Sequence, residues 1–369
     1  MSNSFRAYVG NEKHQKVLIP IISIVLGFIV GIIIMLFSQL NAGYLFTALL
    51  RGVFGINTKF IGTSRSVFNA RYIGEFLVSS MPLILTGLSV AFAYRCGLFN
   101  IGAEGQVMMG SLFSIVVALS FPGLPKVILL PMVVIAGALG GTIWGFIPGL
   151  LKAKYNVHEV VVTIMLNYVG LYFLNWTVKS LPGSSLVRTV DIPDAAWLGS
   201  DFLSDITNNS RLHWGFIIVI IAVYAFYYIM NKTTFGYELR AVGFNKDAAK
   251  YAGINVNKNA ILAMTLSGTF AGLAGTLLTC GTFNYGRVIP AFENYGFNGI
   301  VAALVGGNTA IGSVLGGLLF GALQAIQPIM QANGIPREIA IIITSAIIIF
   351  VAMQNGIKSV LNKIGNKEA

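Results

Sequence analysis

The sequence is short of charged residues. Asp, Glu, Lys and Arg make up only 10% of its 369 residues, and none of them occurs from Val17 through Leu50. Because about 20 apolar residues cross a bilayer, this block is long enough for a complete membrane span. Hydrophobic residues make up 56% of the chain, and its mean hydropathy is +0.78. These values predict an all-α polytopic membrane protein.

Residue types and motifs typical of catalytic, metal and nucleotide-binding sites are also scarce. Two cysteines, Cys96 and Cys280, and three histidines give neither a disulfide framework nor the spacing of a metal site. The chain has no G-x-x-x-x-G-K-[ST] phosphate loop, no HExxH and no CxxC. We therefore expect no catalytic residue, metal site or cofactor here, and any ATP chemistry must lie on a separate subunit. The net charge of +11 lies in loops and tails, which favours contact with anionic lipid over nucleic acid.

Apolar runs predict about ten membrane segments. A short run near 291–307 is interrupted by glycines and is typical of a broken or re-entrant helix. The chain then consists of an N-terminal tail (1–16), a transmembrane domain (17–354) and a C-terminal tail (355–369). The nine longer runs are 17–40, 73–94, 106–121, 127–151, 158–178, 213–231, 259–282, 310–330 and 338–354.

The distribution of basic residues predicts the orientation. With ten segments, the Lys and Arg residues of both tails, the 152–154 turn and the 232–258 loop fall on one side, which the positive-inside rule assigns to the cytoplasm. Both termini are then cytoplasmic. The 41–72 connection conflicts with this orientation, because it carries four basic residues and no acidic one on the other side. It either faces a partner protein or contains an interfacial helix.

Glycines at four-residue spacing in the 127–151 segment indicate close helix packing. Gly137, Gly141, Gly145 and Gly149 form an uninterrupted GxxxG series. Such a stripe lets two helix backbones approach without bulky side chains between them. We favour packing within the chain over a dimer interface.

The strip from Gly97 to Gln106 places three glycines, Asn100, Glu104 and Gln106 between two apolar segments. Irregular backbone at membrane depth is tolerated only where protein or a water-filled cavity supplies hydrogen-bond partners. A carboxylate there costs roughly 3 kcal/mol, which marks a functional candidate. The three polar side chains either line a substrate pathway or satisfy the backbone where a broken helix restarts. We favour the second interpretation for Glu104.

A second polar strip lies in the 158–178 segment. Thr163 and Asn167 are four residues apart and therefore share one helix face. They either line the same pathway or form hydrogen bonds between helices, and the sequence leaves both open.

The loop from Thr233 to Lys258 contains a short helix with strong end signals. Asn245 is a good N-cap, Asp247 lies in the first turn, and Gly253 suits the position after the last turn. The helix between them, Lys246–Ala252, is marginal on its own in water. Apart from Tyr251 and the two lysines, its side chains are small, and the alanines, Ala248 and Ala249 among them, offer little area to lipid. This favours docking into a groove of another protein over lying on the membrane.

Four segments together resemble the permease subunits of bacterial ABC importers. They are GLFNIGAEGQ at 97–106, HEVVVTIMLNYV at 158–169, FGYELRAVGFNKDAAKYAGI at 235–254 and FNGIVAALVGG at 297–307. The resemblance covers about 72–354. It is greatest to the nucleoside permeases of the basic-membrane-protein-associated type, within the superfamily of branched-chain amino acid and ribose permeases.

The resemblance implies a set of partners. Two related permeases pair in the bacterial plasma membrane, here as a heterodimer, two ATPase domains hold ATP and Mg²⁺, and an extracytoplasmic lipoprotein delivers the nucleoside. The loop that matches Arg240–Gly253 would be the coupling helix seated in the ATPase. The alternatives are a permease for ribose-type sugars or branched-chain amino acids, or an ion-coupled secondary transporter that uses Glu104.

Overall fold

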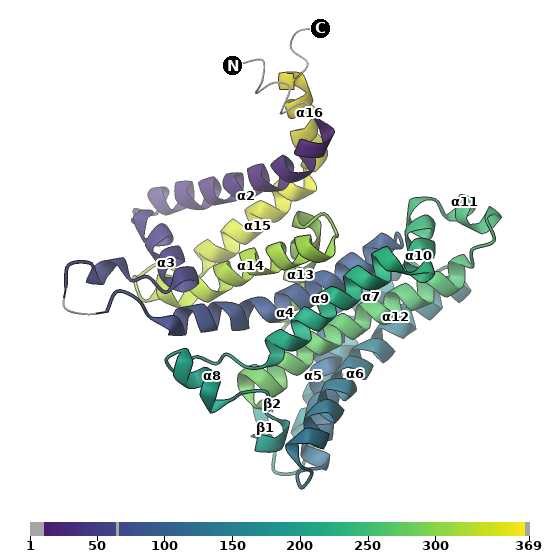
Figure 1. Cartoon of the computed structure of the whole chain (residues 1–369), viewed down its shortest axis with the longest axis horizontal. Coiled ribbons are helices and arrows are strands. Elements are labelled where there is room, and N and C mark those ends of the chain that lie inside the picture. The colour runs from purple at the N-terminus through teal and green to yellow at the C-terminus, as the bar shows by residue number, and fades with distance from the viewer. Residues whose placement is uncertain (1–10, 64–65, 366–369) are drawn as a thin grey trace. The chain divides into compact units, whose positions relative to one another are not determined.

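The computed structural model describes residues 11–63 and 66–365. The chain is mainly helical and divides into two compact units (Figure 1). Unit 1 combines the described residues up to Phe68 with those from Ala322 onward, and unit 2 runs from Asn69 to Gly321. The transmembrane domain expected from 17 to 354 therefore contains two units. Residues 1–10 and 366–369 of the expected tails lie outside the described residues, and the described parts of both tails are helical apart from Asn11.

Unit 1 is held together by its first and last helices. α2 packs against α15 where Gly27 and Gly31, having no side chains, admit Ile347 and Ile343. The basic 41–72 connection contains the helix α3, and its position at the membrane interface stays a prediction. The elements are α2 (Glu12–Phe37), α3 (Gly43–Phe54), the 3₁₀ turn η1 (Thr58–Phe60), the end of α14 (Ala310–Gln331), α15 (Glu338–Ala352) and α16 (Gln354–Gly365).

Unit 2 is a helix bundle with one small sheet. Its first elements are α4 (Ala70–Arg95), α5 (Ala103–Ser120), α6 (Lys126–Tyr155), α7 (Glu159–Ser180), β1 (Arg188–Asp191), η2 (Asp194–Ala196), α8 (Asp201–Ile206) and α9 (Gly215–Lys232). They are followed by α10 (Thr234–Phe244), α11 (Lys246–Tyr251), α12 (Val256–Thr276), the π-helical η3 (Leu277–Phe283), β2 (Tyr285–Arg287), α13 (Tyr295–Val305) and the start of α14. β1 and β2 pair antiparallel.

The number of membrane spans is close to the prediction. Among the described residues, eight helices are long and apolar enough to cross a membrane, and α15 with α16 makes a ninth if this pair, bent by 62°, counts as one span. α13 is too short to cross alone and coincides with the broken helix expected near 291–307. The all-α polytopic fold is therefore confirmed, with ten as an approximate number of segments.

α12 is the central helix of unit 2 and lies against α4, α5 and α6. The GxxxG stripe of α6 faces it. A Cβ atom on Gly141 would collide with the carbonyl oxygen of Gly268, and one on Gly145 with that of Met264. The stripe therefore packs within the chain, as predicted, because only glycine lets these two backbones touch.

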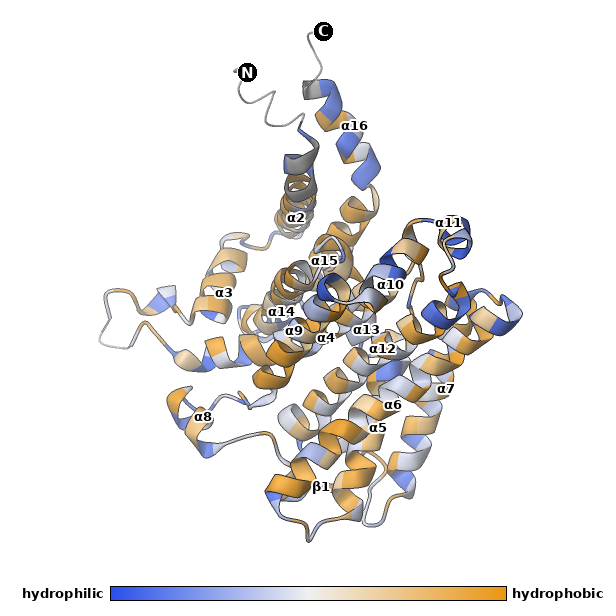
Figure 2. Ribbon diagram, turned by 45° about the vertical axis from the view of Figure 1, so that its right-hand side comes forward, coloured by the Kyte–Doolittle hydropathy of each residue, from blue (hydrophilic) through white to orange (hydrophobic). Residues whose placement is uncertain are grey.

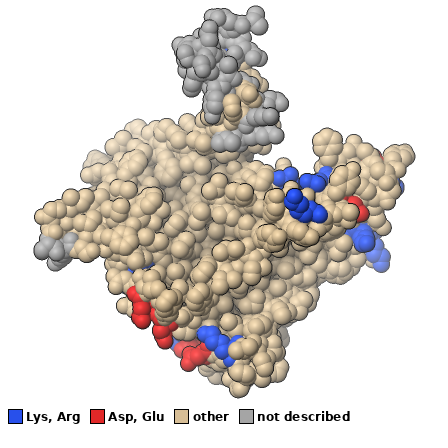
Figure 3. All heavy atoms as spheres, viewed as in Figure 1, with Lys and Arg blue, Asp and Glu red and all other residues tan. Residues whose placement is uncertain are grey.

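Unit 2 has two polar ends. We call the end that carries α10 and α11 the α11 end, and the opposite end, with the sheet, the β end (Figure 1). Figure 2 shows hydrophilic residues concentrated on α11 and its flanking loops, whereas the bundle helices are largely hydrophobic. In Figure 3, basic side chains gather at the α11 end, and acidic and basic side chains lie together at the β end.

Candidate functional site

The Gly97–Gln106 strip is a helix break, as predicted. α4 ends at Arg95 and α5 begins at Ala103, so the irregular part ends before Glu104. Gly97 has a φ of +75°, which favours glycine, and it packs against the backbone of Gly243 in α10. The strip thus connects the α11 end of unit 2 with the start of α5.

Glu104 caps a helix, but not its own. Its side chain is 2% exposed. One carboxylate oxygen accepts a hydrogen bond from the N–H of Asn294 (2.9 Å) and the other from the N–H of Gly296 (2.6 Å). Both donors belong to the start of α13, where N–H groups lack partners inside the helix and the dipole favours an anion. The carboxylate therefore stabilises the restart of a broken segment 190 positions later in the chain.

Asn100 and Gln106 form hydrogen bonds within the protein. Asn100 Nδ2 donates to Oε1 of Gln106 (2.8 Å) and to Oγ of Ser267 in α12 (2.7 Å). Asn100 Oδ1 accepts from the N–H of Gly102 (3.0 Å). Both side chains are at most 1% exposed. These contacts match the interpretation that the two side chains supply hydrogen bonds where the helical backbone is interrupted. They do not place either residue on an open pathway.

Side chains of α7 contact the same helix break and hydrogen-bond its backbone. Asn167 Oδ1 accepts from the N–H of Gly105 (2.8 Å), and its Nδ2 donates to the carbonyl oxygen of Ile101 (3.1 Å). Thr163 donates to its own helix and packs close to Gly102. Of the two interpretations left open by the sequence, the geometry matches hydrogen bonding between helices.

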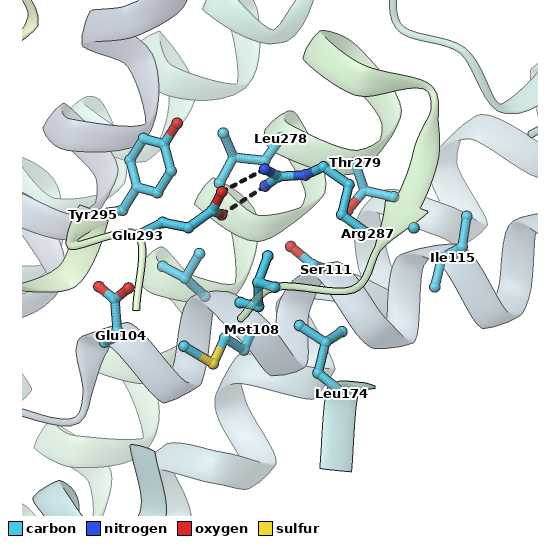
Figure 4. A pocket seen from close by; sticks show the side chains of 13 residues that line it. Glu104, Met108, Ser111, Ile115, Leu174, Leu278, Thr279, Arg287, Glu293 and Tyr295 are labelled. Atoms are coloured by element: carbon cyan, nitrogen blue, oxygen red, sulfur yellow. Dashed lines mark hydrogen bonds and ion pairs between the residues drawn. The ribbon is translucent and has the colours of Figure 1, made fainter. Parts of the chain in front are cut away.

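A small cavity leads from Glu104 towards the β end (Figure 4). Its volume is about 20 Å³, which holds a water molecule but no organic ligand. Among the described residues, no three His, Cys, Asp or Glu side chains form a metal site. The cavity is lined by Glu104, Val107, Met108, Ser111, Ile115, Leu174, Leu278, Thr279, Gly286, Arg287, Ile289, Glu293 and Tyr295.

This cavity contains an ion pair that was not predicted from the sequence. Arg287 donates through both terminal nitrogens to the carboxylate of Glu293, with Nη2 2.6 Å from Oε2 (Figure 4). The guanidinium carbon lies 3.7 Å from the centroid of the Phe283 ring. A signal was present, because these two are the only charged residues between 259 and 336, and Glu293 falls inside the predicted broken helix.

The α11 end contains the predicted short helix. Asn245 Oδ1 accepts from the N–H groups of Asp247 and Ala248, both at 3.0 Å, and Gly253 has a φ of +82°. Of the seven residues predicted to couple to an ATPase, Ala249 is buried and Arg240 is half-buried. The exposed ones are Asn245, Asp247, Ala248, Tyr251 and Gly253.

Comparison with known proteins agrees with this architecture. Residues 72–352 match the family described as branched-chain amino acid transport system / permease component. The chain is 44% identical to the guanosine ABC transporter permease protein NupP of Bacillus subtilis, over 97% of this chain and 99% of that one. It is 41% identical to the nucleoside ABC transporter permease protein NupB of Lactococcus lactis (96% and 95%) and 34% identical to the glucose ABC transporter permease protein TsgB13 of Haloferax volcanii (79% and 78%). The chain therefore belongs to the family of branched-chain amino acid transport permease components and is a multi-pass membrane protein.

Proposed function

We propose that this chain is the permease subunit of an ABC importer that moves nucleosides into the cell. The observation that carries the proposal is the similarity over nearly the whole length to two permeases named for guanosine and nucleosides, at 44% and 41% identity. The similarity to a glucose permease is lower and covers less of the chain. The chain itself is a translocating component and not an enzyme.

The α11 end is the proposed docking site for the ATPase, which would hold ATP and Mg²⁺. α11 is capped at both ends, and two exposed aromatic side chains lie at this site. Tyr251 at the end of α11 is 94% exposed, and Phe244 at the end of α10 is 96% exposed. Two such exposed rings on a polar loop are typical anchors of a protein–protein contact. Because Ala249 is buried, it supports the helix instead of contacting the partner.

Contacts inside unit 2 connect this docking site with the broken segments. A Cβ atom on Gly243 of α10 would collide with the carbonyl oxygen of Arg95, and Gly243 also touches Gly97 at the start of the strip. Arg95 Nε donates to the carbonyl oxygen of Asn308, just after α13 (2.8 Å). A displacement of α10 would therefore act on both irregular segments at once, which supports a coupling role.

We infer the remaining partners from relatives and charge. The same two organisms contain second, more distant relatives, NupQ (27% identical) and NupC (26%), which supports pairing with a second permease. An extracytoplasmic lipoprotein would deliver the nucleoside at the β end. The basic residues of the α11 end then face the cytoplasm of a bacterial cell, together with both termini.

The proposal is tested by uptake of a labelled nucleoside in membranes containing the assembled transporter. Unlabelled nucleosides should compete, and ribose and branched-chain amino acids should not. Tyr251→Ala should weaken ATPase binding about 30-fold, because an exposed aromatic anchor contributes about 2 kcal/mol. The matched control is Tyr224→Ala on α9, which removes a ring 65% exposed and should leave ATPase binding unchanged.

Three results would contradict the proposal. Competition by ribose or leucine alone would indicate another substrate class. Uptake that stops with an uncoupler at constant ATP would indicate an ion-coupled transporter. Normal ATPase binding by Tyr251→Ala would place the docking site elsewhere.

A further inference from the structure

The chain between β2 and α13 crosses part of the membrane without a helix. Gly286 lies against Ile115 of α5, and Asn294 donates to Glu104 of the same helix. Ile115 and Glu104 are eleven positions apart in α5, or roughly 16 Å at the rise of an α-helix. α5 is itself long and apolar enough to cross the membrane. The segment Val288–Asn294 therefore lies at membrane depth.

The backbone of this segment is only partly satisfied. The side-chain amide of Asn175 in α7 binds both backbone polar groups of Ile289. It donates to the carbonyl oxygen (2.7 Å) and accepts from the N–H (2.8 Å). Pro290 and Ala291 are exposed on the surface of unit 2. The N–H groups of Ala291 and Phe292 have no hydrogen-bond partner within residues 11–63 and 66–365. Each unpaired group in hydrocarbon costs several kcal/mol, so this surface needs water.

The Arg287–Glu293 pair lies along this segment. The pair is bidentate, both residues line the cavity, and their side chains are 21% and 29% exposed (Figure 4). Charged residues at membrane depth mark pathways because lipid excludes them. While the two side chains hold each other, the cavity that continues to Glu104 admits no organic ligand. The geometry is that of a closed gate.

We propose that Val288–Asn294 lines the translocation pathway and that the Arg287–Glu293 pair closes it at the β end. The gate opens when the transported molecule takes over the hydrogen bonds of the two side chains. A guanidinium offers only donors and a carboxylate only acceptors, so both can bind neighbouring hydroxyl groups. The matching ligand is an uncharged molecule with adjacent hydroxyls, such as the ribose of a nucleoside. Only this choice of ligand rests on the proposed function.

The first test measures water access in membranes containing the assembled transporter. Cys96 and Cys280 are at most 1% exposed, so a membrane-impermeant thiol reagent should report introduced cysteines only. Ala291→Cys should react at least about tenfold faster than Leu139→Cys, because a thiol facing lipid does not form the reactive thiolate. Leu139 is the matched control, since it is 50% exposed on the regular helix α6. Equal rates would overturn the pathway assignment.

The second test opens the gate in the Ala291→Cys background. Glu293→Gln should raise the labelling rate about threefold, as expected for loss of a partly exposed ion pair. The exchange Arg287→Glu/Glu293→Arg should return the rate towards that of the parent. Asp191→Asn breaks the exposed pair Arg188–Asp191 in the same sheet and should change nothing.

The outcomes separate this inference from the proposed function. An unchanged rate in Glu293→Gln, or an equal rise in Asp191→Asn, would overturn the gate. Labelling as expected without uptake of any nucleoside would leave the gate in place and refute the proposed substrate.

Discussion

Replacement of Glu104 by glutamine tests whether this carboxylate acts as a cap. The side chain accepts from two backbone N–H groups at the start of α13 and is 2% exposed. Glutamine keeps one acceptor oxygen and turns an NH₂ group towards the other N–H. One hydrogen bond to a charged acceptor is lost and a buried donor is left unpaired, at a cost of about 2–3 kcal/mol.

The loss is measurable as a change in thermal stability. For a unit of this size, 1 kcal/mol shifts the unfolding midpoint by roughly 2–4 °C, so Glu104→Gln should melt about 5–10 °C lower. Uptake should fall in parallel, because α13 loses its fixed start. The control is Glu338→Gln, which removes an exposed carboxylate from the first turn of α15 and should cost about 0.5 kcal/mol or less.

Two results would refute the reasoning. A variant that melts like the parent would show that the cap contributes nothing. A variant with parental stability but no transport would show that Glu104 acts on the transported molecule or on a coupled ion. That second result would favour the secondary transporter that the sequence left open.

The other predictions concern packing and pH. Gly141→Ala should lower the free energy of unfolding by about 1–3 kcal/mol, because its Cβ meets the rigid backbone of α12, whereas Gly123→Ala, in open space, should stay within about 0.5 kcal/mol. Thermal unfolding of these two variants measures the difference in stability, and equal unfolding midpoints would contradict the close packing. Burial, and then the charge of Arg211, lower the pKa of His213 to about 4, against about 6.5 in the unfolded chain. The neutral imidazole therefore stabilises the fold fully above pH 6.5, and about 3 kcal/mol is lost as the pH falls to 4. Melting curves from pH 7 to 4 should show this loss in the parent and a flatter dependence in His213→Gln; identical curves would refute it.

Features that depend on residues close together in the chain, such as helix ends, glycine spacing and helix breaks, could be predicted from the sequence. The N-cap at Asn245 and the left-handed Gly253 fix the ends of α11 through contacts within a few residues. The glycines of α6 predicted a close helix contact because a GxxxG stripe has few other uses. The break before α5 followed from polar and glycine residues that a lipid-facing helix does not tolerate.

The partners of the polar residues could not be predicted. Glu104 and Asn294 are 190 positions apart. Asn175 binds Ile289 across 114 positions. Nothing in the local sequence specifies such pairs, since they form only after the bundle brings α5, α7 and the segment before α13 together. The pair Arg287–Glu293 is the exception, because its residues are only six positions apart and a local signal for it was present.

The sequence by itself determined that this chain crosses a membrane many times, that its helices break at defined glycine-rich points and that it carries a capped helix on a basic loop. Hydrophobicity, caps and glycine spacing act locally and can be read along the chain. Only the tertiary structure decided what the buried polar groups do. In the folded chain, Asn100, Gln106 and Asn167 form hydrogen bonds at the broken backbone before α5, and Glu104 caps the start of α13. Arg287 and Glu293 pair beside the segment that has unpaired N–H groups. A buried polar group must find a partner, and which partner it finds is fixed by how the helices pack.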